Sequence, residues 1–365
     1  MNREYGIDIL RIVSTVGVVI LHVFGIFYLK SSAYSGGGYN LIVNYNIASL
    51  FEIMFMCSVN VFGIITGYLY AGKEKHSSYS LIKLLVAYIF YSVLVTFVIK
   101  AIYPESIKTK IQLINNLLPI LGGRLWYITA YVFVFFMIPY MNLFVKLIDK
   151  RHYVRFLGII AVLLGLLSMV KDFFGISMGY SCFWLIFCYF VGAYIKLYKI
   201  NIRKSVSLLL FTGSCLFIFM VNVSTQLLNI NFIDKIYGRL IAYTSPLIVL
   251  NSVSVFFLFK AINVSNKYIK ETLKICSGSA LAVYIIHAHG LFLDNILYPL
   301  MPAKLKENPL KFICFGVIFV FLVFVGGIII DIIRIYFERI IKIDNFYKKI
   351  ATKVDTILLW NCEKK

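Results

Sequence analysis

Long runs of apolar residues recur along the whole chain and are separated by short polar segments. Runs of about 18 or more apolar residues are long enough to cross a bilayer as helices. We expect about ten spans of roughly 17–25 residues. They lie at Gly6–Leu29, Ile47–Tyr70, Leu81–Ile102, Leu125–Val145, Tyr153–Val170, Ser181–Leu197, Val206–Val223, Leu240–Lys260, Ala280–Tyr298 and Phe312–Tyr336. The pattern predicts an all-α protein, built as a polytopic bundle of transmembrane helices.

Composition supports the membrane class and argues against nucleic-acid binding. Of the 365 residues, 61% are hydrophobic and only 14% are charged, whereas soluble domains carry about 25% charged residues. The net charge is +20, but the basic residues separate the apolar runs and form no patch with interleaved aromatic residues. The seven cysteines include no CxxC pair, so we expect neither disulfides nor a metal site.

The basic residues predict the orientation of the chain. Segments that lie inside when the N-terminus is cytoplasmic carry more Lys and Arg than the outside loops, which favours both termini inside. We expect residues 1–336 to form the transmembrane domain. Residues 337–365 alternate apolar and basic residues, which predicts a basic amphipathic helix on the inner leaflet. Anchoring is the simplest interpretation of this tail.

Two ionisable residues share one face of the first span. The eleven helical steps from Arg11 to His22 turn about 1100°, within about 20° of three full turns. Asp8 and Thr15 fall near the same stripe, and the rest of the helix surface is apolar or small. A charge inside a membrane span costs a few kcal/mol, so an ionisable stripe in a span indicates a functional site.

Depth in the membrane connects His22 with Glu52 of the second span. His22 lies about sixteen residues into span one, roughly 24 Å from the inner surface. Span two runs inward, which places Glu52 at a similar depth. A buried Glu beside a His can hold the imidazole in one tautomer or share its proton. A neighbouring hydroxyl could equally satisfy Glu52, so both interpretations stay open here.

Polar residues in two other spans have competing interpretations. His287 and Asp294 are seven residues apart and share a face of span nine. A single intramembrane His, however, more often bonds to a neighbouring helix than takes part in chemistry. Asn60 in span two could likewise be a contact between packed helices.

The start of the fourth span combines small, basic and aromatic residues. Gly122, Gly123 and Arg124 precede Leu125-Trp126-Tyr127. Trp and Tyr are expected at the end of any span because they favour the membrane interface. The paired glycines and Arg124 are less expected, and they indicate an irregular backbone that opens on a cavity.

Taken together, four sequence elements resemble the acyltransferase 3 family over about three-quarters of the chain. They are the Arg-x10-His of span one with Gly6-Ile7-Asp8, Ser58-Val59-Asn60-Val61-Phe62 followed by Ile64-Ile65-Thr66-Gly67-Tyr68-Leu69, Leu125-Trp126-Tyr127 with Tyr131 and Pro139, and Val283-Tyr284-Ile285-Ile286-His287. The resemblance implies a membrane enzyme that moves an acyl group from coenzyme A onto a sugar or a similar acceptor. The members most like this chain acylate bacterial capsule or exopolysaccharide, which implies the bacterial plasma membrane as its location and membrane lipids, acyl-CoA and a polysaccharide or lipid-linked glycan as its partners.

The resemblance assigns roles to the polar residues. Arg11 and Lys83 would meet the phosphates of acetyl-CoA, and His22 would act as general base or carry the acyl group. Glu52 would orient His22, while Arg124, Trp126 and Tyr127, with Asn60 and His287, would bind the acceptor. The chain departs from the family at Ser80-Leu81-Ile82-Lys83, where many members have Arg-x-x-Arg, which weakens the assignment of Lys83.

A transporter or flippase for a lipid-linked sugar or small solute is the alternative. Ionisable residues within spans serve transport as well as catalysis. The chain, however, contains no inverted repeat and no matching pair of Gly- or Pro-broken spans in its two halves, which many transporters have. The pattern therefore favours the enzyme.

Overall fold

All regular secondary structure in the described part of the chain is helical. The computed structural model describes residues 3–25, 38–118, 125–228, 230–358 and 360. The helices are α1 (Tyr5–Phe24), α3 (Tyr39–Phe55), α4 (Ser58–Tyr70), α5 (Tyr79–Ile102), α6 (Lys110–Leu117), α7 (Trp126–Leu147), α8 (Lys150–Ile160), α9 (Leu167–Val170), α10 (Cys182–Leu197), α11 (Lys204–Leu228), α12 (Asn231–Leu240), α13 (Pro246–Lys260), α14 (Lys267–Gly278), α15 (Ala280–Ala288), α16 (Gly290–Phe292), α17 (Tyr298–Lys304), α18 (Pro309–Ile340) and α19 (Asp344–Ile357). Short 3-10 and π turns connect some of them. The all-α bundle predicted from the sequence is confirmed.

Where the structure describes them, each of the ten predicted spans overlaps helical structure, but the helices differ in length, and residues 26–29 of the first predicted span lie outside the described part. Within the described residues, seven helices are long and apolar enough to cross a membrane. A bent pair, Lys267–Ala288 with Gly290–Leu300, makes eight when counted as one span, with an angle of 55° at its break. The apolar helices α10 and α13 are shorter. The last predicted span ended at Tyr336, whereas α18 continues to Ile340.

The eighth predicted span begins later than expected. The sequence predicted Leu240–Lys260, but α13 starts at Pro246. Proline suits the first turn of a helix because its fixed φ is helical and that turn needs no amide donor. The residues before it form a turn that contains Tyr243, which is buried. This turn brings an aromatic side chain into the centre of the protein.

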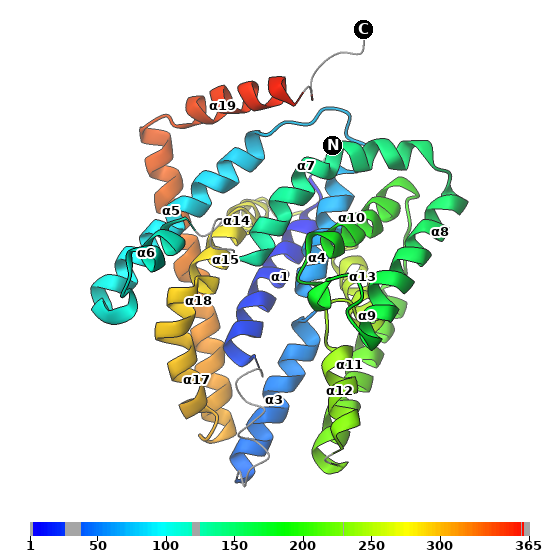
Figure 1. Cartoon of the computed structure of the whole chain (residues 1–365), viewed down its shortest axis with the longest axis vertical. Coiled ribbons are helices and arrows are strands. Elements are labelled where there is room, and N and C mark those ends of the chain that lie inside the picture. The colour runs from blue at the N-terminus through cyan, green and yellow to red at the C-terminus, as the bar shows by residue number, and fades with distance from the viewer. Residues whose placement is uncertain (1–2, 26–37, 119–124, 229, 359, 361–365) are drawn as a thin grey trace.

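Helix α1 runs through the middle of the bundle (Figure 1). It packs against α3, α4, α13, α14, α15 and α18. Its apolar residues Ile7, Leu10, Val19 and Val23 are almost fully buried. In a helix surrounded on most sides by other helices, polar residues either pair with polar groups of those helices or face a cavity. The position of α1 therefore decides where its ionisable residues can act.

Helices α4 and α10 cross with their backbones in close contact. A Cβ at Gly67 would lie 1.9 Å from the Tyr189 carbonyl oxygen, and one at Gly192 would lie 2.0 Å from that of Ile64. Small residues permit such close approach between membrane helices. The two glycines therefore set the distance between α4, which carries part of the central cavity wall, and α10.

Gly192→Ala is expected to destabilise the protein by about 1–3 kcal/mol because α4 and α10 must separate to admit the methyl group. Gly213→Ala in α11 is the matched control, since a Cβ there meets nothing within 4 Å. Thermal unfolding in detergent should show a midpoint several degrees lower for Gly192→Ala and unchanged for Gly213→Ala. Equal midpoints for both variants would contradict the close crossing.

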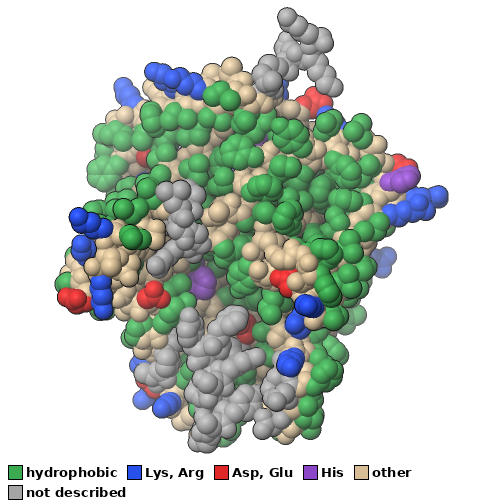
Figure 2. All heavy atoms as spheres, in the orientation of Figure 1, with side chains coloured by type: hydrophobic (Ala, Val, Ile, Leu, Met, Phe, Trp, Pro, Cys, Tyr) green, Lys and Arg blue, Asp and Glu red, His purple; other side chains and the backbone are tan. Residues whose placement is uncertain are grey.

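The outer surface has the character of a lipid-facing bundle. Figure 2 shows hydrophobic side chains over most of the face turned to the viewer, with Lys and Arg mainly toward its margins. On α18, Phe321 and Leu322 expose 63% and 62% of their surface. The start of α1 and helix α19 lie at the same end of the bundle (Figure 1). Exposed apolar residues on this scale are expected where lipid, rather than water, surrounds a protein.

The C-terminal helix α19 packs on the protein with its apolar side. Tyr347 and Ala351 are buried in a cluster with Ile82 of α5. The carboxylate of Asp355 accepts hydrogen bonds from the Ser78 amide (2.7 Å) and the Ser77 hydroxyl (2.8 Å). We expected this helix to lie on the inner leaflet, but part of its apolar side contacts α5. Its lysines Lys348, Lys349 and Lys353 are exposed.

His76, between α4 and α5, contacts Trp360 of the C-terminal tail. Its ring lies 4.5 Å from that of Trp360 and 4.6 Å from that of Phe135, measured between centroids. Burial lowers the pKa of His76, with the nearby Lys73 charge acting in the same direction and Asp355 opposing it. The neutral imidazole is therefore the form that suits this aromatic contact.

Acidification is expected to loosen the Trp360 contact. Because the pKa of His76 is lower in the folded state, burying its neutral imidazole stabilises the fold. This stabilisation is complete above the ordinary histidine pKa of about 6.5 and is lost as the pH falls below it. The difference in fluorescence between the wild type and Trp360→Phe should shift as the pH is lowered from 7.5 to 5. His76→Phe keeps an aromatic ring and should remove this dependence. A shift that persists in His76→Phe would assign it to another group.

Candidate functional site

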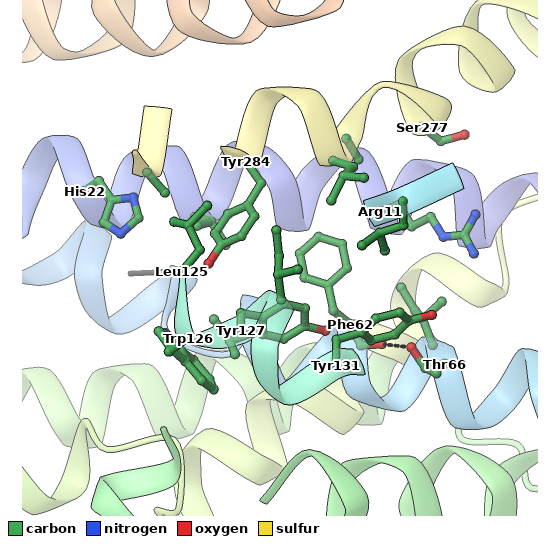
Figure 3. A pocket seen from close by; sticks show the side chains of 18 of the residues that line it. Arg11, His22, Phe62, Thr66, Leu125, Trp126, Tyr127, Tyr131, Ser277 and Tyr284 are labelled. Carbon is green, nitrogen blue, oxygen red and sulfur yellow. Dashed lines mark hydrogen bonds between the residues drawn. The ribbon is translucent and has the colours of Figure 1, made fainter. Parts of the chain in front are cut away.

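A cavity of about 400 Å³ lies beside α1 in the centre of the bundle. Arg11, Val18 and His22 line it from α1, since their spacing of seven and four residues places them on one helix face. Figure 3 shows His22 and Arg11 at opposite ends of the cavity. The sequence predicted this shared face. The structure adds that the face borders an open space.

Six aromatic residues form much of the cavity surface, which we call the aromatic wall: Phe62, Trp126, Tyr127, Tyr131, Tyr243 and Tyr284. Trp126 and Tyr284 lie toward His22, and Tyr131 lies toward Arg11 (Figure 3). The rings of Tyr127 and Tyr284 are 6.1 Å apart between centroids, and those of Trp126 and Tyr243 are 6.0 Å apart. The wall combines apolar ring faces with several hydroxyl groups.

A second pocket of about 500 Å³ adjoins the start of α1, and we call it the vestibule. Its lining includes four cations and two carboxylates: Arg3, Arg11, Lys73, Lys196, Glu4 and Asp8. Arg11 lines both this vestibule and the cavity. The two spaces are therefore neighbours, and Arg11 stands at their boundary.

Asp8 lies in the vestibule near Arg11 and is bonded mainly to other residues. Its buried carboxylate accepts hydrogen bonds from Arg3 (2.6 Å) and from the Ser277 hydroxyl (3.1 Å). The Arg11 guanidinium is farther away, at 3.9 Å. Among the described residues, the Arg11 side chain has no hydrogen-bond acceptor. Its donors are therefore free for an anionic ligand, and guanidinium suits phosphate contacts in particular.

His22 lies against a second histidine. The rings of His22 and His287 are 5.0 Å apart between centroids. His287 Nδ1 is 2.5 Å from the Val283 carbonyl oxygen, which can only accept, so we assign the proton to Nδ1. The Nδ1 atom of His22 is buried and has no partner in the described part of the chain. His22 lines the cavity, whereas His287 contacts His22 and is not among the cavity-lining residues.

Asn60 fixes part of the aromatic wall instead of lining the cavity. Its amide donates to the Tyr243 carbonyl oxygen (2.9 Å), and its oxygen accepts from the Trp184 indole (2.8 Å). The amide group is fully buried. Asn60 therefore ties α4 and α10 to the turn that presents Tyr243.

Comparison with known families decides the class of protein. The model of the acyltransferase domain called acyltransferase 3 matches residues 4–332. The chain belongs to this family. The match supports a membrane acyltransferase over the transporter alternative. Comparisons with curated proteins and with solved structures find no match.

The acyltransferase brings several of the residues predicted from its sequence to one place. Arg11, His22, Trp126 and Tyr127 line one cavity, although they come from α1 and α7. His287 reaches the same region through its contact with His22. These residues are close together because α15 packs against α1 and the start of α7 lines the same cavity.

Other predicted residues lie elsewhere in the acyltransferase. Lys83 lines a separate pocket beside the α18–α19 turn, although the next residue, Leu84, lines the cavity. Successive helical side chains differ by about 100° in direction, so α5 presents them to different spaces. Glu52 is buried in α3 and is not among the cavity-lining residues. Arg124 lies outside the described residues, as do Gly122 and Gly123, so the irregular backbone predicted there stays a prediction.

Sequence reasoning missed Tyr243 and Ser277 as residues of the site. Tyr243 was placed inside a predicted span, where an aromatic residue carries no signal. Pro246 could have indicated a helix start and hence a preceding turn. Ser277, at the end of α14, lines the cavity and donates a hydrogen bond to Asp8. A serine in a polar stretch of sequence does not indicate that it belongs to a site.

Proposed function

We propose that the acyltransferase moves an acetyl or similar short acyl group from acyl-CoA to a hydroxyl of a cell-surface polysaccharide or its precursor. The observation that carries this proposal is the position of Arg11 at the boundary between a cation-rich vestibule and the cavity that contains His22. A donor with an anionic end and a reactive acyl end fits two such adjoining spaces. The proposed location is the bacterial plasma membrane.

The vestibule supports coenzyme A as the donor. Arg3, Arg11, Lys73 and Lys196 outnumber its two carboxylates, which favours a ligand with several phosphates. From Arg11 the polar face of α1 leads to His22 over roughly 16 Å. An extended, mostly neutral arm can follow that face and bring a thioester to His22, while the phosphates stay among the cations.

His22 is the residue proposed to act on the reacting groups. As general base it takes the proton of the acceptor hydroxyl while that oxygen bonds to the thioester carbonyl carbon. The carbon–sulfur bond then breaks, and the proton passes to the departing thiolate to give free coenzyme A. Alternatively, an imidazole nitrogen takes the acyl group first and passes it to the hydroxyl. In both routes an ester replaces a thioester.

The aromatic wall supports a sugar as the acceptor. Sugar rings have C–H faces that pack on aromatic rings and hydroxyls that need polar partners. Trp126, Tyr127 and Tyr284 provide both kinds of surface in the cavity, and Trp126 and Tyr284 lie toward His22 (Figure 3). An acceptor stacked here would have a hydroxyl close to the imidazole.

The test uses the full-length protein in liposomes with coenzyme A thioesters labelled on the acyl group. Acetyl and succinyl donors are compared, each with and without a soluble oligosaccharide. We expect transfer of label to the oligosaccharide and stoichiometric release of coenzyme A. No release of coenzyme A with either donor would contradict acyl-CoA as the donor, and release without transfer to any glycan tested would contradict the acceptor.

A further inference from the structure

A pocket of about 460 Å³ lies where α5 begins and α18 turns into α19. Three cations line it: Lys83 from α5, Arg339 from the last turn of α18, and Lys342 from the turn between α18 and α19. We call these three residues the basic triad. None of them lines the cavity or the vestibule. The pocket is thus separate from the cavity and from the vestibule.

The carboxylates of this pocket already have cationic partners outside the basic triad. Glu338 pairs with Arg334 and accepts a hydrogen bond from the Tyr347 hydroxyl (2.8 Å). Asp344 pairs with Lys348 (2.7 Å), and this contact together with the Tyr79 hydroxyl holds its pKa below the usual range.

The basic triad is left with uncompensated charge. Lys83 lies within electrostatic range of Asp344, but no member of the triad forms a salt bridge or side-chain hydrogen bond with a described residue. Three cations around one pocket, with its carboxylates already paired, make a site for an anion. A phosphate diester has the charge and the acceptor atoms that such a site requires.

The surroundings of the triad identify which kind of anion fits. The last turns of α18 expose Tyr336 (63%), Phe337 (58%) and Ile340 (57%), and the next residue, Ile341, exposes 64% of its surface. These apolar side chains continue the lipid-facing surface of α18 directly beside the cations. An acyl chain and a phosphate headgroup would therefore find matching partners next to each other. Basic pockets at the cytoplasmic ends of membrane helices bind anionic headgroups in this way.

We propose that Lys83, Arg339 and Lys342 bind the phosphate headgroup of an anionic phospholipid of the inner leaflet. The bound lipid bridges α5 and the α18–α19 turn. It holds α19 in its position across this end of the bundle. The inference is independent of the acyl donor and of the acceptor.

The experiment compares two triple variants of the full chain. Lys83→Gln/Arg339→Gln/Lys342→Gln removes the basic triad. Arg151→Gln/Lys349→Gln/Lys353→Gln removes the same number and kinds of charge from exposed positions on α8 and α19. Each protein is placed in detergent and titrated with phosphatidylglycerol or phosphatidylcholine. Native mass spectrometry records bound lipid, and thermal unfolding records stabilisation.

The wild type and the exposed-charge variant should bind phosphatidylglycerol in preference to phosphatidylcholine and be stabilised by it. A loss of about fivefold in affinity per charge predicts a loss of about a hundredfold in the basic-triad variant. Equal losses in the two variants would show general attraction to positive charge and overturn the site. Displacement of phosphatidylglycerol from the wild type by free coenzyme A at the triad would overturn the choice of ligand. Should the triple variant fail to fold, Lys342→Gln alone should still lose about fivefold.

Discussion

His22→Ala is expected to lower kcat for acyl transfer by about 10²–10⁴-fold, the range that general acid–base catalysis contributes. The smaller alanine side chain enlarges the cavity without a steric clash, and His287 remains held by the Val283 carbonyl. Transfer of a labelled acyl group from acyl-CoA to an oligosaccharide in liposomes measures the loss. Thermal unfolding measures whether the variant remains folded.

His152→Ala is the matched control, since His152 is an exposed residue of α8 that pairs with Asp149. It should keep full activity. Incubation of the wild type with labelled acyl-CoA and no acceptor separates the two roles of His22. A label that becomes covalently attached to the wild type, and not to His22→Ala, indicates an acyl carrier. Full activity of a folded His22→Ala protein would contradict a role for His22 as general base or acyl carrier.

Arg11→Gln is expected to raise KM for acyl-CoA by about 10–100-fold, because hydrogen bonds to charged groups contribute about 1.5–3 kcal/mol. The Arg11 guanidinium is the group shared by the vestibule and the cavity. Arg11→Lys keeps the charge but loses the bidentate geometry, so its KM should fall between those of the wild type and Arg11→Gln. Initial rates at varied acyl-CoA concentration give these values.

Lys83→Gln tests whether Lys83 binds coenzyme A, as the sequence implied, or belongs to a separate pocket, as in the structure. The resemblance to the family implied that Lys83 binds the phosphates of coenzyme A. In the structure Lys83 lines a different pocket from Arg11, so Lys83→Gln should leave KM for acyl-CoA unchanged. An increase in KM equal to that of Arg11→Gln would show that Lys83 takes part in binding acyl-CoA.

Helical periodicity correctly predicted that Arg11 and His22 share one face of α1. Arg11 and His22 share a face because eleven residues correspond to three helical turns, and this holds in any α-helix. The class of fold followed from composition and apolar run lengths for the same reason: each depends only on local chain properties and on the membrane thickness. The family resemblance followed from short motifs, which are also local.

The partners of that face could not be read from the sequence. Asn60 was predicted either to bind substrate or to be a contact between packed helices, and its amide group bonds to Tyr243 and Trp184, both distant in sequence. Lys83 and Leu84 are neighbours in sequence yet line different pockets. These outcomes depend on which helices pack together and on how each is rotated, and one sequence contains no direct record of either.

The sequence by itself determined that this protein is a helical membrane bundle, that it resembles acyltransferases, and that one polar stripe runs along its first span. Tertiary structure alone decided that the stripe borders a cavity, that Arg11 divides this cavity from a cation-rich vestibule, and that His287 contacts His22. The difference has one physical reason. Helix formation and membrane insertion depend on local sequence, whereas a cavity exists only where several packed helices leave space between them.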